Sequence, residues 1–144
     1  MTTQDENKEI VRKVEEAWDA GNTDALDDLF AADFDNSQNA APGLPPGLAG
    51  AKMAHGAAMQ SFPDRKAVIE DMIADGDQVV VRGRITGTNK GGVQFLGDPA
   101  NDKPIDFEYI VVYRLKDRKI VQSWALNDVP TLMMQLGAMP APGA

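Results

Sequence analysis

The sequence contains no cysteine and only one histidine, His55. Without cysteine, the chain can form no disulfide, no thiolate metal site and no cysteine nucleophile. With one histidine, a single chain cannot build a multi-histidine zinc or iron site. The acidic residues Asp24, Asp27 and Asp28 lack the spacing of a calcium-binding loop, and a solvated helix face accounts for them better. We therefore expect no bound metal.

Positive charge is also scarce, with 14 Lys and Arg against 22 Asp and Glu, a net charge of −8 and a pI near 4.5. Phosphate groups and anionic membrane surfaces both attract basic patches, so we expect neither nucleic acid nor a membrane as a partner. No stretch approaches the roughly 18 apolar residues of a membrane span. Residues 1–6 are polar and acidic, whereas a signal peptide is basic and then apolar. A cytoplasmic location is therefore expected.

The length and composition fit one globular domain. The 144 residues are 43% hydrophobic and 25% charged, which are ordinary values for a folded protein. A domain of about this size buries roughly two thirds of the surface that its unfolded chain exposes. We therefore expect a single domain over residues 1–144 with a core of its own.

Helices are predicted in the first half of the chain. Residues 5–20 have helical periodicity up to Gly21, and a shorter helix follows over about 23–30. Proline and glycine crowd residues 40–50, which predicts a loop. Helical periodicity returns over 51–61 and ends before Pro63. The apolar stripe of the first helix consists of Ile10, Val11, Val14, Ala17 and Trp18.

After residue 63 the pattern changes to the period of two that is typical of strands. We predict strands over 66–74, 78–88, 105–115 and 119–126, followed by a helix that ends at Gly137. Strands joined by short turns pair antiparallel. The sequence therefore predicts an α+β fold in which the N-terminal helices pack in the concave side of a curved, mainly antiparallel sheet. Such a fold leaves an apolar hollow, and the end of the last strand would open onto its mouth.

Asp128 is the best single candidate for chemistry, because it follows an apolar strand and comes shortly after Trp124. Burial beside apolar groups would raise its pKa toward the range useful for proton transfer. The alternative role is structural. Aspartate is a favoured helix N-cap, and Asp128 precedes Pro130 and Thr131 as a cap would. The local sequence alone favours capping, whose hydrogen bonds lower the pKa that catalysis needs raised.

Several segments, taken in order, carry a resemblance to a known family. They are residues 7–18, 21–29, the Pro-Gly-Leu-Pro-Pro-Gly run at 42–47, Phe-Pro-Asp at 62–64, residues 70–77, Phe-Leu-Gly at 95–97, residues 119–124 and Asp128. Their order and spacing are similar to the SnoaL-like polyketide cyclase family, within the superfamily that shares the cone-shaped nuclear transport factor fold. The resemblance implies a cone-shaped α+β barrel with a core over about 7–137 and a short flexible tail over 138–144.

The resemblance also implies a function. The family's catalytic aspartate lies four residues after the last-strand tryptophan, which corresponds to Asp128 here. In the family's cyclases this group is the general acid/base of an intramolecular aldol condensation that closes the last ring of an aromatic polyketide, with no metal or cofactor. A small hydrophobic molecule is the implied partner, and a homodimer is the implied assembly.

This chain departs from the family at two histidine positions, which correspond to residues 34–37 and Ser123. Asn36, Ser37 or Gln38 could donate the missing hydrogen bond instead. His55 is the alternative catalytic partner of Asp128, although a structural role for it on a methionine-rich helix is equally open. The residues predicted to bind substrate, some of which could equally be core residues, are Trp18, Phe34, Asn36, Met59, Phe107, Tyr109 and Trp124.

Other functions stay open beside the cyclase. A ketosteroid-isomerase-like enzyme would use an aspartate near Asp33 or Asp35. An epoxide hydrolase would need an Asp-Arg-Asp network, and no Arg-x-Asp strand pair occurs near Asp106. A non-catalytic module could hold a small hydrophobic ligand or mediate dimerisation, and the missing histidines favour it. We expect Arg82 and Arg84 to form cross-strand ion pairs with Asp106 or Glu108 and to take no part in chemistry.

Overall fold

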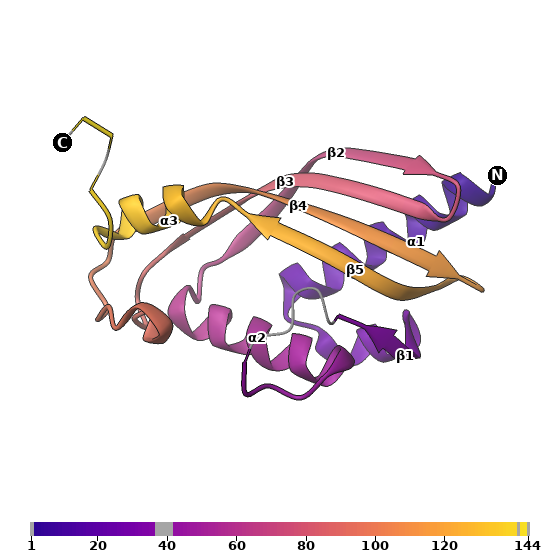
Figure 1. Cartoon of the computed structure of the whole chain (residues 1–144), viewed down its shortest axis with the longest axis horizontal. Coiled ribbons are helices and arrows are strands. Elements are labelled where there is room, and N and C mark those ends of the chain that lie inside the picture. The colour runs from indigo at the N-terminus through magenta and orange to yellow at the C-terminus, as the bar shows by residue number, and fades with distance from the viewer. Residues whose placement is uncertain (1, 37–41, 141, 144) are drawn as a thin grey trace.

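The computed structural model in Figure 1 describes residues 2–36, 42–140 and 142–143. Within these ranges the α-helices are α1 (Thr3–Ala20), α2 (Gly47–Ser61) and α3 (Val129–Leu136), and the 3-10 helices are η1 (Thr23–Asp28) and η3 (Gln94–Leu96). The strands are β1 (Phe30–Asp35), β2 (Lys66–Asp75), β3 (Gln78–Thr88), β4 (Pro104–Lys116) and β5 (Lys119–Asn127). No helix among the described residues has both the length and the hydrophobicity that a membrane crossing requires.

The five strands form one curved, mixed sheet in the order β1-β5-β4-β3-β2. Strands β2 to β5 form the predicted antiparallel meander, and β1 pairs parallel with β5. In Figure 1, α1 passes behind the strands and α2 lies beside β1. The predicted α+β class, with N-terminal helices against a curved sheet, is confirmed. The predicted barrel is wrong, because β1 and β2 are open edges that do not pair with each other in the described part of the chain.

Strand β1 corrects the prediction of a helix through Phe30. The short helix η1 ends at Asp28, and Phe30 begins a strand in which Phe30 and Phe34 are buried. Backbone pairing with the far end of the sequence holds this strand, since Ile120 donates its N–H to the Leu29 carbonyl over 2.9 Å. Periodicity within a short window cannot reveal a partner so distant in the sequence.

Helix α2 begins at Gly47, inside the stretch 40–50 that was predicted to be a loop; residues 40 and 41 of that stretch lie outside the described residues. Pro46 occupies the N-cap position, where the missing N–H of proline costs little. The buried Gly50 allows the preceding turn to fold back onto the helix. A Cβ at this position would lie 1.9 Å from the carbonyl oxygen of Pro45.

The predicted apolar stripe of α1 forms the main contact between the helices and the sheet. Ile10, Val11, Val14 and Ala17 are buried, and Val11 and Val14 are 0% exposed. They pack on the concave face of the sheet, mainly over β2 and β3. Glu15 lies at the edge of the stripe and is only partly buried. The helix therefore covers part of the concave face and leaves the rest open.

The convex face carries the predicted ion pairs. Arg84 Nε lies 2.9 Å from Asp106 Oδ1, and Arg82 Nη1 lies 3.2 Å from Glu108 Oε1. The predicted cross-strand pairing is therefore confirmed. Trp124 also faces this side. It lies opposite Val112 in the register of β4 and β5. Successive side chains of a strand point to opposite faces, and both residues lie one position away from those that point to the concave face.

We expect Val14→Ala to lower the free energy of unfolding by about 2 to 3 kcal/mol, because the change removes two buried carbons and leaves a cavity under α1. The exposed Lys13 on the same helix provides the control, and Lys13→Ala should change stability by less than about 0.5 kcal/mol. Urea denaturation of both variants measures the difference. Equal stabilities would show that α1 does not depend on this contact.

Candidate functional site

A cavity of about 320 Å³ lies between the concave face of the sheet and the helices α1 and α2. Its apolar wall includes Trp18, Phe30, Phe34, Leu44, Ile85 and Val111. Its polar groups include Glu15, Asn36, His55, Arg65, Tyr109 and Tyr113. An apolar enclosure with a few converging polar groups is the usual form of a small-molecule site.

Three aromatic side chains build a fixed wall on one side of the cavity. The rings of Phe30 and Phe34, which β1 supplies, are edge to face with centroids 4.7 Å apart. The Trp18 ring of α1 meets Phe30 at 6.4 Å in the same arrangement. Edge-to-face pairs are favourable beyond the area that they bury. Trp18 and Phe34 thus line the cavity. That they bind substrate stays a prediction.

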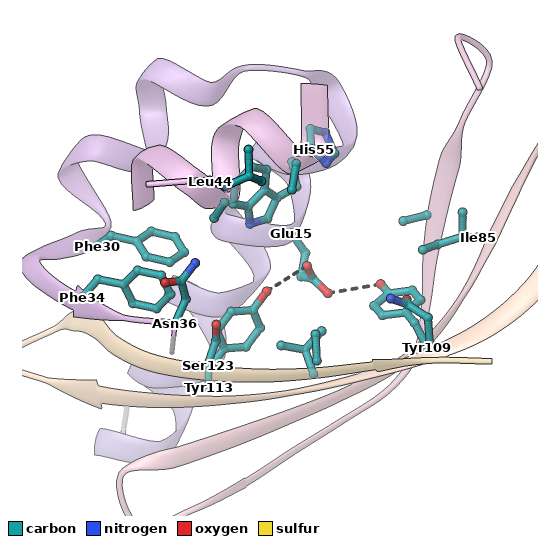
Figure 2. Close-up of a pocket in the computed structure, with 18 of the residues that line it drawn as sticks. Glu15, Phe30, Phe34, Asn36, Leu44, His55, Ile85, Tyr109, Tyr113 and Ser123 are labelled. Atoms are coloured by element: carbon teal, nitrogen blue, oxygen red, sulfur yellow. Dashed lines mark hydrogen bonds between the residues drawn. The ribbon is translucent and has the colours of Figure 1, made fainter. Parts of the chain in front are cut away.

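Glu15 lies at the centre of the polar groups. Figure 2 shows its carboxyl between two tyrosines of β4, with a hydrogen bond to each. The hydroxyl of Tyr109 donates to Oε1 and that of Tyr113 donates to Oε2, each over 3.1 Å. The two tyrosines are four residues apart on one strand and therefore face the same side of the sheet. Together they fix the position of the carboxyl.

The surroundings of Glu15 change its affinity for protons. Burial raises the pKa of the Glu15 carboxyl above its ordinary value of 4.5, although the two tyrosine hydrogen bonds and the charge of Arg65 act in the opposite direction. Burial and the nearby carboxylate raise the pKa of Tyr109 and Tyr113 as well. The phenols therefore stay protonated at neutral pH and act as hydrogen-bond donors.

Gly83 makes room for Tyr109. The two residues lie opposite each other on β3 and β4, and a Cβ at Gly83 would lie 2.7 Å from the Tyr109 ring and 2.5 Å from the carbonyl oxygen of Val68. Only a glycine leaves this space free. The ring can then lie flat over β3 while its hydroxyl reaches Glu15.

His55 projects from α2 on the helical side of the cavity (Figure 2). Its ring lies 4.8 Å from that of Trp18 and forms a hydrogen bond with the Trp18 backbone. Nε2 has no hydrogen-bond partner among the described residues, so the Trp18 bond uses Nδ1. Burial, and then the charge of Arg65, lower the pKa of His55, which leaves a neutral ring with a free acceptor nitrogen. A catalytic role for His55 stays a prediction.

Arg65 is the cationic group of the cavity wall. It lies directly before β2, and its charge acts on Glu15, His55 and Tyr109. Its Nη1 is buried without a hydrogen-bond partner in the parts of the chain that the structure describes. Burial lowers the pKa of its guanidinium, but arginine stays charged in proteins. A polar substrate group could therefore gain a charged donor here.

Asp128 occupies a different environment. It is exposed and caps α3, with Oδ1 accepting the Thr131 N–H over 3.2 Å and Oδ2 accepting the Thr131 hydroxyl over 2.6 Å. The predicted capping role is therefore confirmed. Asp128 is not among the described residues that line the cavity, although Asn127 before it is. Its catalytic role stays a prediction.

Other predicted site residues are divided between the cavity and its surroundings. Tyr109 and Asn36 line the cavity, but the Asn36 side-chain oxygen already accepts the Gly47 N–H over 2.9 Å. Ser37 and Gln38 lie outside the described residues. Three residues predicted to bind substrate lie elsewhere. Phe107 is in the core, and Met59 is on α2 outside the described lining. Trp124 is on the convex face, where the guanidinium carbon of Arg114 lies 5.3 Å from the centroid of the Trp124 ring.

Glu15, Arg65 and Tyr113 also line the cavity, but they are not among the site residues predicted from the sequence. One signal was available for Glu15, since Val11 and Trp18 stand four residues before it and three after it on the same helix face. An acidic residue between two apolar neighbours at these spacings lies at the border of the buried stripe. Arg65 follows the turn at Pro63, and no pattern in the neighbouring sequence indicates that its side chain faces the cavity.

Comparisons with known proteins find the same fold in solved structures and identify one family. The sequence profile of the SnoaL-like polyketide cyclase family matches residues 8–136. No curated protein matches the chain at a significant level. A solved structure from Bacillus cereus, named as a candidate polyketide cyclase, is 30% identical, with a TM-score of 0.79 over 93% of this chain and 82% of that chain.

Two Streptomyces proteins are also similar. IdmH from Streptomyces antibioticus, named as a candidate polyketide cyclase, is 26% identical with a TM-score of 0.76 over 91% of this chain and 98% of that chain. TsrD from Streptomyces laurentii is 22% identical with a TM-score of 0.83 over 96% of this chain and 100% of that chain. The likeness to TsrD shows the fold alone.

We expect Gly83→Ala to displace the Tyr109 ring and to lower the free energy of unfolding by about 1 to 3 kcal/mol, because the new methyl group overlaps the ring and the β2 backbone. The control is Gly56→Ala on α2, where a Cβ meets nothing within 4 Å and alanine favours the helix by up to about 1 kcal/mol. Chemical denaturation measures both. A Gly83→Ala protein as stable as the wild type would contradict the close approach.

We also expect the raised pKa of Glu15 to make stability depend on pH. Between the ordinary value of 4.5 and the higher pKa of the folded state, the folded protein binds more protons than the unfolded chain. The free energy of unfolding should therefore fall as pH rises through this window. Glu15→Gln lacks this titration, so the stability difference between wild type and variant should change across the window in urea denaturation. Parallel stability curves would contradict the shift.

Proposed function

This chain belongs to the SnoaL-like polyketide cyclase family, and from that membership we propose that it is a cofactor-independent enzyme that closes a ring in a hydrophobic polycarbonyl substrate by acid/base catalysis. The single observation that carries the proposal is a carboxyl group, with raised pKa and two hydroxyl donors, that lines a cavity with an aromatic wall. A group that exchanges protons must meet the substrate in a site of this kind.

The reaction proposed is an intramolecular aldol addition. A base takes a proton from the carbon next to one carbonyl, and the electron pair of that C–H bond forms an enolate. The enolate carbon then bonds to a second carbonyl carbon, whose oxygen becomes an alkoxide and takes up a proton. The product is an isomer of the substrate, and later loss of water completes the condensation. A hydrogen-bond donor near the enolate oxygen lowers the barrier of the first step.

The size and chemistry of the cavity fit this class of substrate. Its volume of about 320 Å³ lies at the lower end of ordinary ligand sites. The aromatic wall of Trp18, Phe30 and Phe34 suits flat aromatic rings, which stack or meet such side chains edge to face. Arg65, whose Nη1 has no partner among the described residues, can offer a charge-assisted hydrogen bond to a carbonyl oxygen.

A non-catalytic binding module is the second candidate function. The observation that favours it is the state of Asp128, the acid/base position of the family, whose two carboxylate oxygens both bond to Thr131 at an exposed helix start. In that case the cavity would hold a small hydrophobic molecule unchanged. The two candidates differ in whether bound carbonyl compounds react.

We expect Asp128→Asn to lower turnover roughly 100-fold or more if Asp128 is the acid/base. Asparagine caps a helix about as well as aspartate, so stability should stay the same and any loss of turnover would concern chemistry. The substrate for this test is an aromatic diketone whose two side chains can close a six-membered ring. The rate of ring closure is measured by the change in absorbance. His55→Gln tests the second predicted residue in the same assay.

Each result of this experiment has a distinct meaning. Full turnover by Asp128→Asn would exclude Asp128 as the acid/base and leave the enzyme proposal intact. Saturable binding of the diketone to the wild type without any reaction would overturn the enzyme proposal and support the binding module.

A further inference from the structure

We infer that Glu15, held by Tyr109 and Tyr113, is a catalytic residue of this cavity, which takes the α-proton from a carbonyl compound and returns it to the new alkoxide. The inference takes its reaction class from the proposed function. It assigns the proton transfer to a residue of the first helix, whereas the family resemblance points to the end of the last strand.

Position is the first argument. Glu15 lines the cavity, and Figure 2 shows its carboxyl pointing into the space between the helices and the sheet. The buried neighbours Val11 and Val14 hold this part of α1 against the sheet. A general base must come within hydrogen-bonding reach of the proton that it removes. Glu15 meets this requirement for a molecule in the cavity, whereas the exposed Asp128 is bonded to Thr131.

Hydrogen-bonding capacity is the second argument. A carboxylate oxygen can accept about two hydrogen bonds, and each oxygen of Glu15 accepts one from a tyrosine. Within the described residues, one acceptor position on each oxygen is therefore left for a substrate. The two phenols orient the carboxyl from β4, and Gly83 gives the Tyr109 ring the space to do so. The carboxyl is thus oriented before any substrate binds.

The titratable groups around Glu15 are the third argument. Tyr109 and Tyr113 face it from β4, Arg65 from the segment before β2, and Asp19 from α1. Asp19 itself accepts the Ala67 N–H over 2.6 Å. Burial and the charge of Asp19 raise the pKa of Glu15, and the tyrosines and Arg65 lower it, with burial as the largest effect. A carboxyl with raised pKa is a stronger base than an exposed one and can also return its proton.

The proposed step balances without any further reagent. An ionised Glu15 oxygen takes the α-proton, and the C–H electron pair passes into the enolate. Once Glu15 is protonated, the Tyr109 hydroxyl is free to donate to the enolate oxygen. Addition of the enolate carbon to the second carbonyl forms the C–C bond and an alkoxide. The alkoxide takes the proton from Glu15, which restores the carboxylate.

A purely structural role is the alternative, because the same hydrogen bonds tie α1 to β4. The test therefore needs a chemical readout. The first readout is the exchange of the α-protons of 2-acetylnaphthalene for deuterium in D2O, measured by NMR. The second is ring closure of the aromatic diketone. Exchange requires proton removal alone, so it reports on the base even where no ring forms.

We expect Glu15→Gln to slow exchange roughly 100-fold or more, with little change in KM. The matched control is Glu16→Gln, the same change at the next position of α1, where the side chain is exposed. The control should exchange at the wild-type rate. Glu15→Asp, which keeps the carboxyl but withdraws it by one methylene, should retain part of the rate. Wild-type exchange by Glu15→Gln would overturn the inference.

The Tyr109→Phe and Tyr113→Phe double variant tests the inference through the pH–rate profile for exchange, which would not shift if Glu15 had only a structural role. This test can be made even if Glu15→Gln fails to fold. The tyrosine hydrogen bonds lower the pKa of Glu15, so their loss should raise it. The acidic limb of the pH–rate profile for exchange should move to higher pH. An acidic limb at its wild-type position would overturn the assignment of Glu15 as the base.

The two readouts separate the inference from the proposed function. Exchange that depends on Glu15, without ring closure, would overturn the cyclase proposal and uphold the inference. Ring closure that survives Glu15→Gln but fails in Asp128→Asn would overturn the inference and uphold the cyclase proposal. A wild type that neither exchanges protons nor closes rings would overturn both.

Discussion

The burial of one apolar stripe of α1 against the concave face of the sheet is the contact on which the cavity depends. Val11 and Val14 are completely buried in it, so neither the rotation of the helix nor its distance from the sheet can change freely. This placement sets Glu15 and Trp18 at the border of the stripe, over the part of the sheet that the helix leaves open. The cavity exists because α1 and α2 cover only part of a curved surface.

Placing a carboxyl in such a cavity costs free energy, because burial disfavours its charged form. The hydroxyls of Tyr109 and Tyr113 offset part of this cost with one hydrogen bond to each oxygen. The same bonds orient the group and tie α1 to β4. A polar cluster of this kind is expensive for stability alone, and strongly shifted pKa values in a cleft are typical of functional sites.

The chain has two carboxyl groups of interest in opposite surroundings. Asp128 is exposed and caps a helix, whereas Glu15 lines the cavity beside aromatic rings. Family membership speaks for the reaction class, because the sequence profile spans residues 8–136. The choice of the proton-transferring residue depends instead on which carboxyl a bound molecule can touch.

The sequence by itself determined the elements and the faces that follow from short-range periodicity: the buried stripe of α1, the four-stranded meander, the cross-strand pairs of Arg82 and Arg84, and the cap at Asp128. Tertiary structure alone decided the parallel strand β1, the start of α2 at Gly47, the orientation of Trp124 and the meeting of Glu15 with Tyr109 and Tyr113. Helix and strand periods report on neighbours within a few residues. Strand pairing, strand register and the pKa of a buried carboxyl depend on groups that are distant in the chain and become neighbours only when it folds.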